Sequence, residues 1–293
     1  MGFAGVKSYW ELTKPRIVFL LVYTSLISYL LASKIYEKEI LASTLLVSMV
    51  AITAGSAGCD AVTSYIDRNI DMVMKRTRHR PLPSGRIVPP ENGLHFGLAL
   101  LSLAALLSLL INTAAFLVMT LGILDNVIIY SYWLKRKNPL NIIFGGVSGG
   151  MPAVFGWVSA TGGKIDLFSI LLGAVVVAWI PNHIWNLALY HRKDYVAVGV
   201  PMLPIVVNEK TAVRCTASTV PILFLLTLLL GVIGDFGLIY WVASIGFGII
   251  ILVGNIYAIF KPTPKNLWSM FKLSSPYLVV VFTAMLIDAF FKI

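Results

Sequence analysis

Charged residues are scarce in this sequence. Asp, Glu, Lys and Arg make up only 12% of the 293 residues, about half of their share in soluble domains. Hydrophobic residues make up 58% of the chain, and the mean hydropathy is +0.86. So few charges exclude a water-soluble globular fold, and the composition predicts an integral membrane protein.

Cysteine is nearly absent. The two cysteines, Cys59 and Cys215, lie far apart and form no CxxC or zinc-ligand pattern. We therefore expect reduced thiols and no disulfide. The chain also lacks a low-complexity tract and a clear internal repeat. We expect one transmembrane domain over residues 1–293.

Long apolar runs fill most of the chain. A membrane-spanning helix takes about 20 apolar residues, and we find nine candidate runs. None alternates apolar and polar residues as a barrel strand does. The sequence thus predicts an all-α, polytopic membrane helix bundle. The expected spans are Ile17–Ala32, Ile40–Asp60, Leu94–Ile111, Ala114–Leu134, Leu140–Ala160, Leu167–Tyr190, Thr216–Ile233, Gly237–Phe260 and Pro276–Phe290.

The basic residues divide unevenly between the two sides of this bundle. With the N-terminus inside, 19 of the 23 Lys and Arg residues fall on the inner side and 4 on the outer side. The outer four are Lys34, Lys38, Lys164 and Lys292. This bias follows the positive-inside rule and supports an odd number of spans. Two long loops, residues 67–93 and 191–215, lie on the inner side.

The net charge of +10 does not indicate a nucleic-acid partner. The basic excess follows the inner loops, and no single basic face with interleaved aromatic residues stands out. Membrane topology and attraction to anionic lipid headgroups account for the bias.

The stretch "DRNIDMVMKRTRHRPL", residues 67–82, concentrates charge at the end of the second span. Asp67 and Asp71 share a helix face if this helix continues to about Lys75, as we expect. A carboxylate pair is typical of Mg²⁺ sites, where the ion also binds substrate phosphates, and the basic residues that follow suit a diphosphate. The alternative is a salt-bridge cluster at the membrane surface.

Polar residues also gather near the end of the sixth span, in "NHIWNLALYHRKD", residues 182–194. Polar side chains at membrane depth usually face a cavity or a partner helix. His183 alone suits a structural role, whereas the group of polar residues as a whole favours a functional site: His183, Asn186, His191, Lys193 and Asp194. In a third inner loop, Lys135 and Arg136 suit either phosphate binding or topology.

These stretches resemble the UbiA-type intramembrane prenyltransferases and, more narrowly, their haem-farnesylating branch, the protohaem IX farnesyltransferases. The resemblance covers nearly the whole chain. It is carried, in order, by ELTKPRIVFLL, DRNIDMVMKRTRHRPL, LKRKNPLNIIFGGVSGGMPAVFGW, NHIWNLALYHRKDYVAVGVPMLPIV and FKLSSPYLVVVFTAMLID. Quinone- and lipid-directed members of the superfamily usually carry a more acidic second motif than Asp194 alone.

The resemblance implies transfer of a farnesyl group from farnesyl diphosphate to a vinyl group of haem B, which gives haem O and diphosphate. It implies Mg²⁺ as cofactor and haem B as substrate. The implied catalytic residues are Asp67, Asp71, His183 and Asp194. The implied metal ligands are Asp67, Asp71, Asp194 and Thr63, which stands where the family commonly has asparagine. The implied diphosphate ligands are Lys75, Arg76, Lys135, Arg136, Arg16 and Lys193. The implied haem or prenyl contacts are His183, Trp185 and Asn186.

The resemblance also implies a multi-pass protein of the cell membrane with its active-site loops on the cytoplasmic side. The short termini, without an Arg- and Ser-rich presequence, favour a prokaryotic plasma membrane. Expected partners are the bilayer, haem B and farnesyl diphosphate, with hand-over of the product to a haem A synthase or a terminal oxidase assembly.

Two other functions stay open. One is prenyl transfer to a quinone precursor or an archaeal-type glycerol lipid, which a second motif richer in aspartate would favour. The other is secondary transport, with Asp60 or Asp125 as coupling site. Transporters usually bind their substrates near the midplane between related halves, whereas the acids here cluster at the inner boundary.

Three further features have mainly structural explanations. Residues Gly145–Gly150 contain overlapping small-xxx-small pairs, which are typical of close helix packing. We expect Asp125, in the fourth span, to accept a hydrogen bond from a neighbouring helix. We expect Asp288, near the outer end of the ninth span, to lie at the membrane interface.

Overall fold

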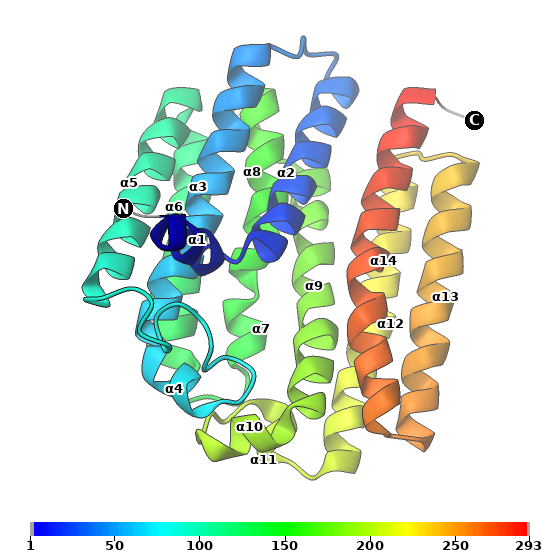
Figure 1. The fold of residues 1–293 in the computed structure, drawn as a ribbon. Coiled ribbons are helices and arrows are strands. Elements are labelled where there is room, and N and C mark those ends of the chain that lie inside the picture. Colours follow the sequence, from blue (N-terminus) through cyan, green and yellow to red (C-terminus); the bar gives the residue numbers. More distant parts are fainter. Residues whose placement is uncertain (1–2, 292–293) are drawn as a thin grey trace.

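The computed structural model describes residues 3–291, and no strand occurs among them. Nine of the described helical segments are long and apolar enough to cross a membrane, which confirms the predicted all-α bundle. They run side by side (Figure 1). They are α2 (Pro15–Ile35), α3 (Ala42–Ile66), α5 (Glu91–Ile111), α6 (Thr113–Leu124) with the π-helix η1 (Asp125–Leu134), α7 (Asn141–Gly145) with α8 (Val147–Thr161), α9 (Leu167–Tyr190), α12 (Glu209–Ile233), α13 (Leu238–Phe260) and α14 (Pro264–Phe291).

Two helices begin earlier than predicted. The seventh span was expected from Thr216 and the ninth from Pro276, but α12 begins at Glu209 and α14 at Pro264. Apolar runs mark only the part of a helix that lies in lipid, and these first turns are polar. The Asn208 side chain accepts a hydrogen bond from the Thr211 N–H and caps α12. The second long loop therefore ends at Asn208, not Cys215.

The helix that carries Asp67 also differs from its prediction. It was expected to continue to about Lys75, but α3 ends at Ile66 and the short α4 (Arg68–Val73) follows. The Asp71 N–H still donates to the Asp67 carbonyl at 2.9 Å, so the two aspartates remain one turn apart. The backbone is extended at Met74 and ends α4 there.

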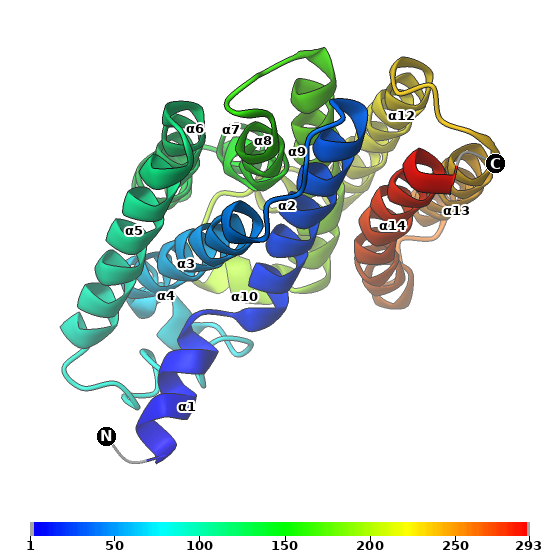
Figure 2. The same cartoon turned by 90° about the horizontal axis from the view of Figure 1, so that it is seen from above.

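The core lies between the central helices. α3 packs against α5, α2 against α8, α9 against α12, and α13 against α14. Figure 2 shows α5 and α6 at one end of the molecule and α13 at the other, with α2, α3, α8 and α9 between them. The largest apolar cluster joins α2, α8, α9 and α12–α14, and includes the fully buried Trp157, Leu172 and Phe282.

Glycines let several of these helices approach closely. A Cβ on Gly156 would lie 2.0 Å from the Ser25 carbonyl oxygen, and one on Gly150 would lie 2.6 Å from the Gly173 carbonyl oxygen. The predicted packing role of the Gly145–Gly150 stretch is thus confirmed at Gly150.

Two intramembrane acids bond to neighbouring helices. Asp125 accepts the Ser148 N–H at 2.7 Å, as predicted. Asp288, predicted near the outer end of the ninth span, is buried, and its carboxylate accepts the Tyr240 N–H at 2.7 Å. Tyr240 lies in the first turn of α13, where N–H groups have no partner within the helix. Asp288 therefore caps α13 from another helix.

The segments at one end of the bundle, residues 67–90 and 191–208, are called the loop end below. They contain α4, α10 (Arg192–Ala197) and α11 (Leu203–Val206). Buried Met74, Trp185, Tyr195 and Met202 pack together and hold the two segments against the bundle. The helix α1 (Phe3–Leu12) crosses the direction of the bundle and is tied to residues 67–90 by the Glu11–Arg86 ion pair at 2.6 Å.

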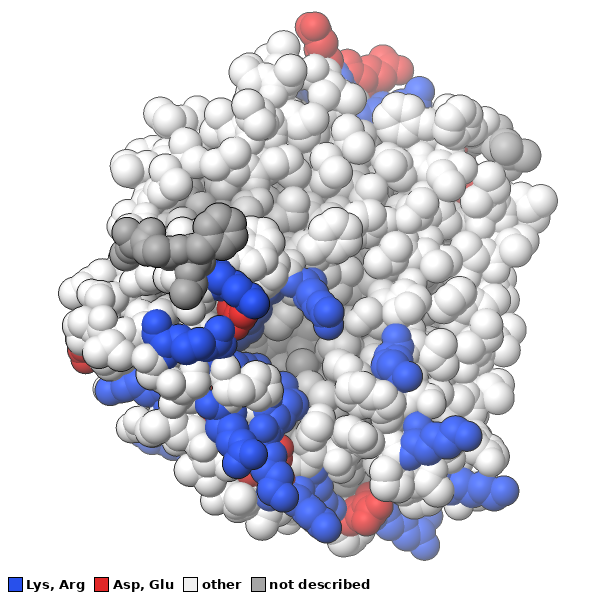
Figure 3. Space-filling view, viewed as in Figure 1, with Lys and Arg blue, Asp and Glu red and all other residues white. Residues whose placement is uncertain are grey.

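Charge is distributed unevenly over the surface. Figure 3 shows Lys and Arg gathered on the lower part of the molecule around a hollow, with an uncharged band above. Lys292, assigned to the opposite side, lies outside the described residues.

Candidate functional site

A polar cavity of about 210 Å³ lies at the loop end. Its wall includes three carboxylates, from Asp60, Asp67 and Asp71, and four basic side chains, from Lys14, Arg76, Arg80 and Lys135. These groups come from the start of α2, from α3 and α4, from the segment after α4 and from the end of η1. The sequence motif and the third inner loop therefore meet in one cavity.

Each of the three carboxylates is paired with a basic side chain. Lys14 lies 2.8 Å from Asp60, and Arg80 lies 2.9 Å from Asp71. Lys135 forms an ion pair with Asp67, and the Arg136 guanidinium lies 3.7 Å from the other oxygen of that carboxylate. The salt-bridge alternative is thus correct as a description of contacts. It does not account for the cavity that the pairs surround.

The buried pair between Lys135 and Asp67 fixes a positive charge in the cavity. Burial by itself lowers the pKa of Lys135, but attraction to Asp67 and the hydrogen bond to it outweigh burial and raise the pKa above its ordinary value. Lys135 therefore carries its charge at every physiological pH.

The π-helix η1 explains how Lys135 reaches the cavity. Asn126, Tyr130 and Lys135 line the cavity and follow one another at intervals of four and five residues, and Ser131, next to Tyr130, lines it too. A π-helix, with about 4.4 residues per turn, brings such positions to one face. On an α-helix with 3.6 residues per turn, Lys135 would point about 180° away from Asn126.

The absence of a side chain at Gly145 leaves room for the ring of Tyr130. A Cβ on Gly145 would lie 2.5 Å from both Cβ and Cδ2 of Tyr130. Any side chain at this position would push Tyr130 and the π-helix towards the cavity. Gly145 thus has a packing role specific to this site.

Several predicted site residues meet in the cavity. Asp67, Asp71, Thr63, Arg76 and Lys135 all line it. The buried Thr63 hydroxyl donates to the Asp60 carbonyl at 3.3 Å. Arg136 is not among the lining residues, and its guanidinium donates to the Ile66 carbonyl at 2.7 Å.

Other predicted residues do not line the cavity. Lys75, Arg16 and Lys193 are exposed. Lys75 points away because α4 ends at Val73 and the chain turns before it. Asp194 lies outside the lining and accepts the backbone N–H of Arg76 at 3.3 Å. It therefore joins the two loop-end segments and fixes the place of Arg76.

The second polar motif packs into the protein instead of facing the cavity. The His183 ring stacks against Trp179 and Phe271, each with a centroid distance of 4.4 Å, and His183 Nδ1 lies 2.6 Å from Ser274 Oγ. Trp185 is buried in the loop-end cluster, and the Asn186 amide donates to the Asn182 carbonyl. On α9 the cavity contacts come from Ile184 and Leu187.

Some cavity residues had little signal in the sequence. Arg80 belongs to the charged motif, but only the fold shows that it bends back to Asp71. Lys14 lies in the quoted ELTKPR stretch, where its neighbour Arg16 seemed the better candidate. Asn126 and Tyr130 were not predicted as site residues, because in an α-helix they would not lie on the same face as Lys135.

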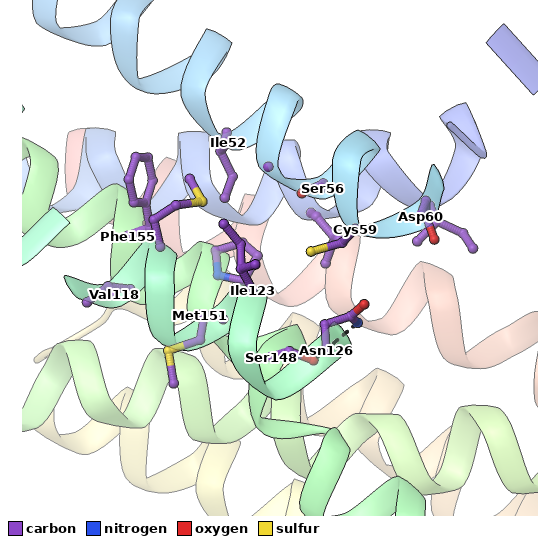
Figure 4. A pocket seen from close by; sticks show the side chains of 16 residues that line it. Ile52, Ser56, Cys59, Asp60, Val118, Ile123, Asn126, Ser148, Met151 and Phe155 are labelled. Atoms are coloured by element: carbon purple, nitrogen blue, oxygen red, sulfur yellow. Dashed lines mark hydrogen bonds between the residues drawn. The ribbon is translucent and has the colours of Figure 1, made fainter. Parts of the chain in front are cut away.

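An apolar cavity of about 100 Å³ continues from the polar one (Figure 4). The two cavities share Ile17, Asp60 and Asn126. The apolar cavity leads away from the loop end between α2, α3, α6 and α8, past Cys59 and Ile123 to Ile52 and Phe155. The combined cavity can hold a molecule with an anionic head and an apolar tail.

The polar cavity also suits a divalent cation. Among residues 3–291, no cluster of three or more His, Cys, Asp or Glu side chains is arranged to hold a metal ion. However, Asp67 Oδ1 and Asp60 Oδ2 are buried and accept no hydrogen bond. Buried oxygens without donors are unfavourable. Two carboxylates fit Mg²⁺, which binds few protein ligands and takes the rest from phosphates and water.

The sequence matches the model of the UbiA prenyltransferase family over residues 21–276. Protoheme IX farnesyltransferase of Desulforudis audaxviator is 40% identical over 98% of this chain and 89% of its own length. Protoheme IX farnesyltransferase 2 of Cenarchaeum symbiosum is 41% identical over 97% and 96%, respectively.

Solved structures share the fold. A structure of digeranylgeranylglyceryl phosphate synthase superposes with a TM-score of 0.79, covers 97% of this chain and 98% of its own, and is 22% identical. A UbiA homologue from Archaeoglobus fulgidus bound to GPP and Mg²⁺ superposes with a TM-score of 0.65 at 14% identity, covering 95% of this chain and 99% of its own.

Proposed function

Because the chain belongs to the UbiA prenyltransferase family, we propose that it transfers a farnesyl group from farnesyl diphosphate to a vinyl group of haem B and so makes haem O. The chain is a multi-pass membrane prenyltransferase. The assignment of the site rests mainly on the polar cavity, which opens into the apolar cavity. This shape matches a diphosphate head with the first part of a prenyl tail.

The diphosphate would lie among Lys14, Arg76, Arg80 and Lys135, which can neutralise the charge that develops as it leaves. Asp67 would hold Mg²⁺ against the diphosphate together with Asp71 and the free oxygen of Asp60, and the bound ion would supply further charge stabilisation. Thr63 lies beside these carboxylates.

The reaction breaks the bond between the first prenyl carbon and the diphosphate oxygen. The vinyl group of haem B supplies the electron pair for the new carbon–carbon bond. Water then gives its hydroxyl to the remaining vinyl carbon and its proton to the departing diphosphate. The product is a hydroxyethylfarnesyl haem.

The allylic cation formed in this step must be kept from bulk water. Tyr130 and Tyr195 line the polar cavity and present aromatic rings that can stabilise a cation. Ile184, Leu187 and Met202 close much of the remaining wall. His183, Trp185 and Asn186 take no step in this proposal, because their side chains pack away from the cavity.

The proposal treats the whole chain as one catalytic domain with the loop end on the cytoplasmic side. The prenyl chain would keep the product in the bilayer. This favours its hand-over within the membrane, to a haem A synthase or a terminal oxidase assembly.

An acceptor panel tests the function. Purified protein in detergent would receive farnesyl diphosphate, Mg²⁺ and either haem B, a quinone precursor or a glycerol lipid acceptor. We expect diphosphate release and a prenylated product with haem B only. Prenylation of a quinone precursor or lipid with no haem product would replace this proposal by the alternative within the same family.

A further inference from the structure

The apolar cavity is too small for a farnesyl tail. Its volume is about 100 Å³, which is smaller than the cavity of about 150 Å³ that is known to bind the six carbons of benzene. It therefore has room for about one five-carbon isoprene unit. A farnesyl chain has three such units, so the distal part of the chain must lie elsewhere.

The apolar cavity has a closed far end. Ile52 lies eight residues before Asp60, about 12 Å along α3. Beyond it Phe155 is fully buried, and Met119 and Ile52 are 5% and 4% exposed. These residues pack with Ala51, Ala104 and Ala115 in one cluster. A chain that continued straight would run into this core.

A larger space lies beside the cavity. An apolar groove of about 640 Å³ runs over α6, α8, α9 and α12. It is lined by residues such as Leu121, Val154, Val177 and Ile222, and no charged side chain lines it. The groove has ample room for the remaining isoprene units.

Of residues 3–291, only Val118 and Met151 line both the cavity and the groove. They form the wall between the two. Opposite Met151, α6 carries Gly122, where an added Cβ would lie 3.2 Å from Met151 Cβ. The only flexible side chain in this wall is therefore Met151, whose unbranched thioether adopts several shapes easily. Figure 4 shows Met151 at the side of the cavity.

We propose that the prenyl chain leaves the apolar cavity sideways past Met151, and that its distal units lie in the groove between α6, α8 and α9. Met151 then determines which prenyl lengths bind. The first isoprene unit lies in the cavity, and the later units displace lipid from the groove. This inference rests on the proposed function only in that the substrate is a prenyl diphosphate.

Binding without an acceptor tests the inference separately from the proposed reaction. Calorimetry would give the Kd values of the unreactive dimethylallyl, farnesyl and geranylgeranyl thiolodiphosphates in the presence of Mg²⁺. For Met151→Trp we expect farnesyl binding to weaken at least tenfold relative to dimethylallyl, whose single isoprene unit stays in the cavity. For Met151→Ala we expect geranylgeranyl binding to tighten severalfold relative to farnesyl.

Two further variants complete the test. Ala174→Trp fills the groove at a distance from the polar cavity, and it should weaken farnesyl binding while leaving dimethylallyl binding unchanged. Phe155→Ala opens the far end and should leave the length preference unchanged. The proposal would be overturned if Phe155→Ala changed the preference for prenyl chain length. It would also be overturned if Ala174→Trp had the same length preference as the wild type. Failure of haem farnesylation would leave these binding results unaffected.

Discussion

At the scale of single residues, Arg80 and Lys75 differ in their position relative to the polar cavity. Arg80 lies 2.9 Å from Asp71 and lines the polar cavity, whereas Lys75 is exposed and lies outside the lining. Both belong to the same charged motif, so they form a matched pair for substitution.

We predict that Arg80→Met raises the KM for farnesyl diphosphate by about tenfold or more, because a hydrogen bond to a charged group contributes about 1.5–3 kcal/mol. Lys75→Met should change KM by less than about threefold, as expected for an exposed charge. Steady-state kinetics with varied farnesyl diphosphate measures both values. Equal effects of the two substitutions would contradict the placement of the diphosphate.

Lys135 gives a prediction for pH dependence. Its pKa is raised, so its pair with Asp67 contributes fully below the ordinary lysine pKa of about 10.4 and is lost only as pH rises through the higher folded value. We predict that kcat/KM does not fall between pH 6 and 9 through loss of this charge. Lys135→His should introduce such a fall as the imidazole loses its proton. A pH–rate profile of each protein measures the difference.

The sequence indicates the chemistry of the site better than its geometry. Asp67, Asp71, Arg76 and Lys135 stand out because charge is scarce in this chain. The exposure of Lys75 depends on where α4 ends, and the burial of His183 depends on packing against α14. Such features are set by contacts between distant segments, which one sequence does not reveal.

At the scale of helices, Gly156 tests the packing of α8 on α2. A Cβ on Gly156 would lie 2.0 Å from the Ser25 carbonyl oxygen, which belongs to the backbone and cannot rotate away. We predict that Gly156→Ala destabilises the protein by about 1–3 kcal/mol, the usual range for overpacking. Thermal unfolding in detergent should show a lower Tm.

The matched control is Gly246→Ala in α13, where nothing lies within 4 Å of an added Cβ. Alanine is the better helix former by about 1 kcal/mol, so this variant should unfold at an equal or higher temperature. Equal losses of Tm in both variants would mean that the close approach of α8 to α2 is unimportant.

The predicted helices were right in number and approximate position, but not in local geometry. Apolar length shows where a helix crosses lipid. It does not show that Asp125–Leu134 adopts a π-helix, because an α-helix of the same residues is equally apolar. The residues that this geometry aligns, Asn126 and Tyr130, were missed for that reason.

At the scale of the whole molecule, charge asymmetry predicts orientation. Basic side chains gather at the loop end (Figure 3), and from the positive-inside rule we propose that this end faces the cytoplasm. We predict that an impermeant maleimide labels Lys38→Cys in intact cells, and labels Lys137→Cys only after the membrane is opened. Both variants would be made in a chain without Cys59 and Cys215. The reverse pattern would invert the proposed topology.

Composition alone was sufficient to predict an integral membrane protein, because few soluble chains are so poor in charge. The shape of the combined cavity and its side groove could not be predicted, since each is formed by side chains from at least four helices.

The most direct measurement is the mass of haem extracted after incubation of the protein with haem B, farnesyl diphosphate and Mg²⁺. The wild type and Glu209→Gln, an exposed substitution far from the cavity, should both give haem heavier by one farnesyl group and one hydroxyl. The product should be absent with EDTA and reduced about 10²–10³-fold in Asp67→Asn, as when a charge-stabilising group is removed. Unchanged product formation by Asp67→Asn, or unmodified haem from the wild type, would contradict the assignment of this cavity to haem farnesylation.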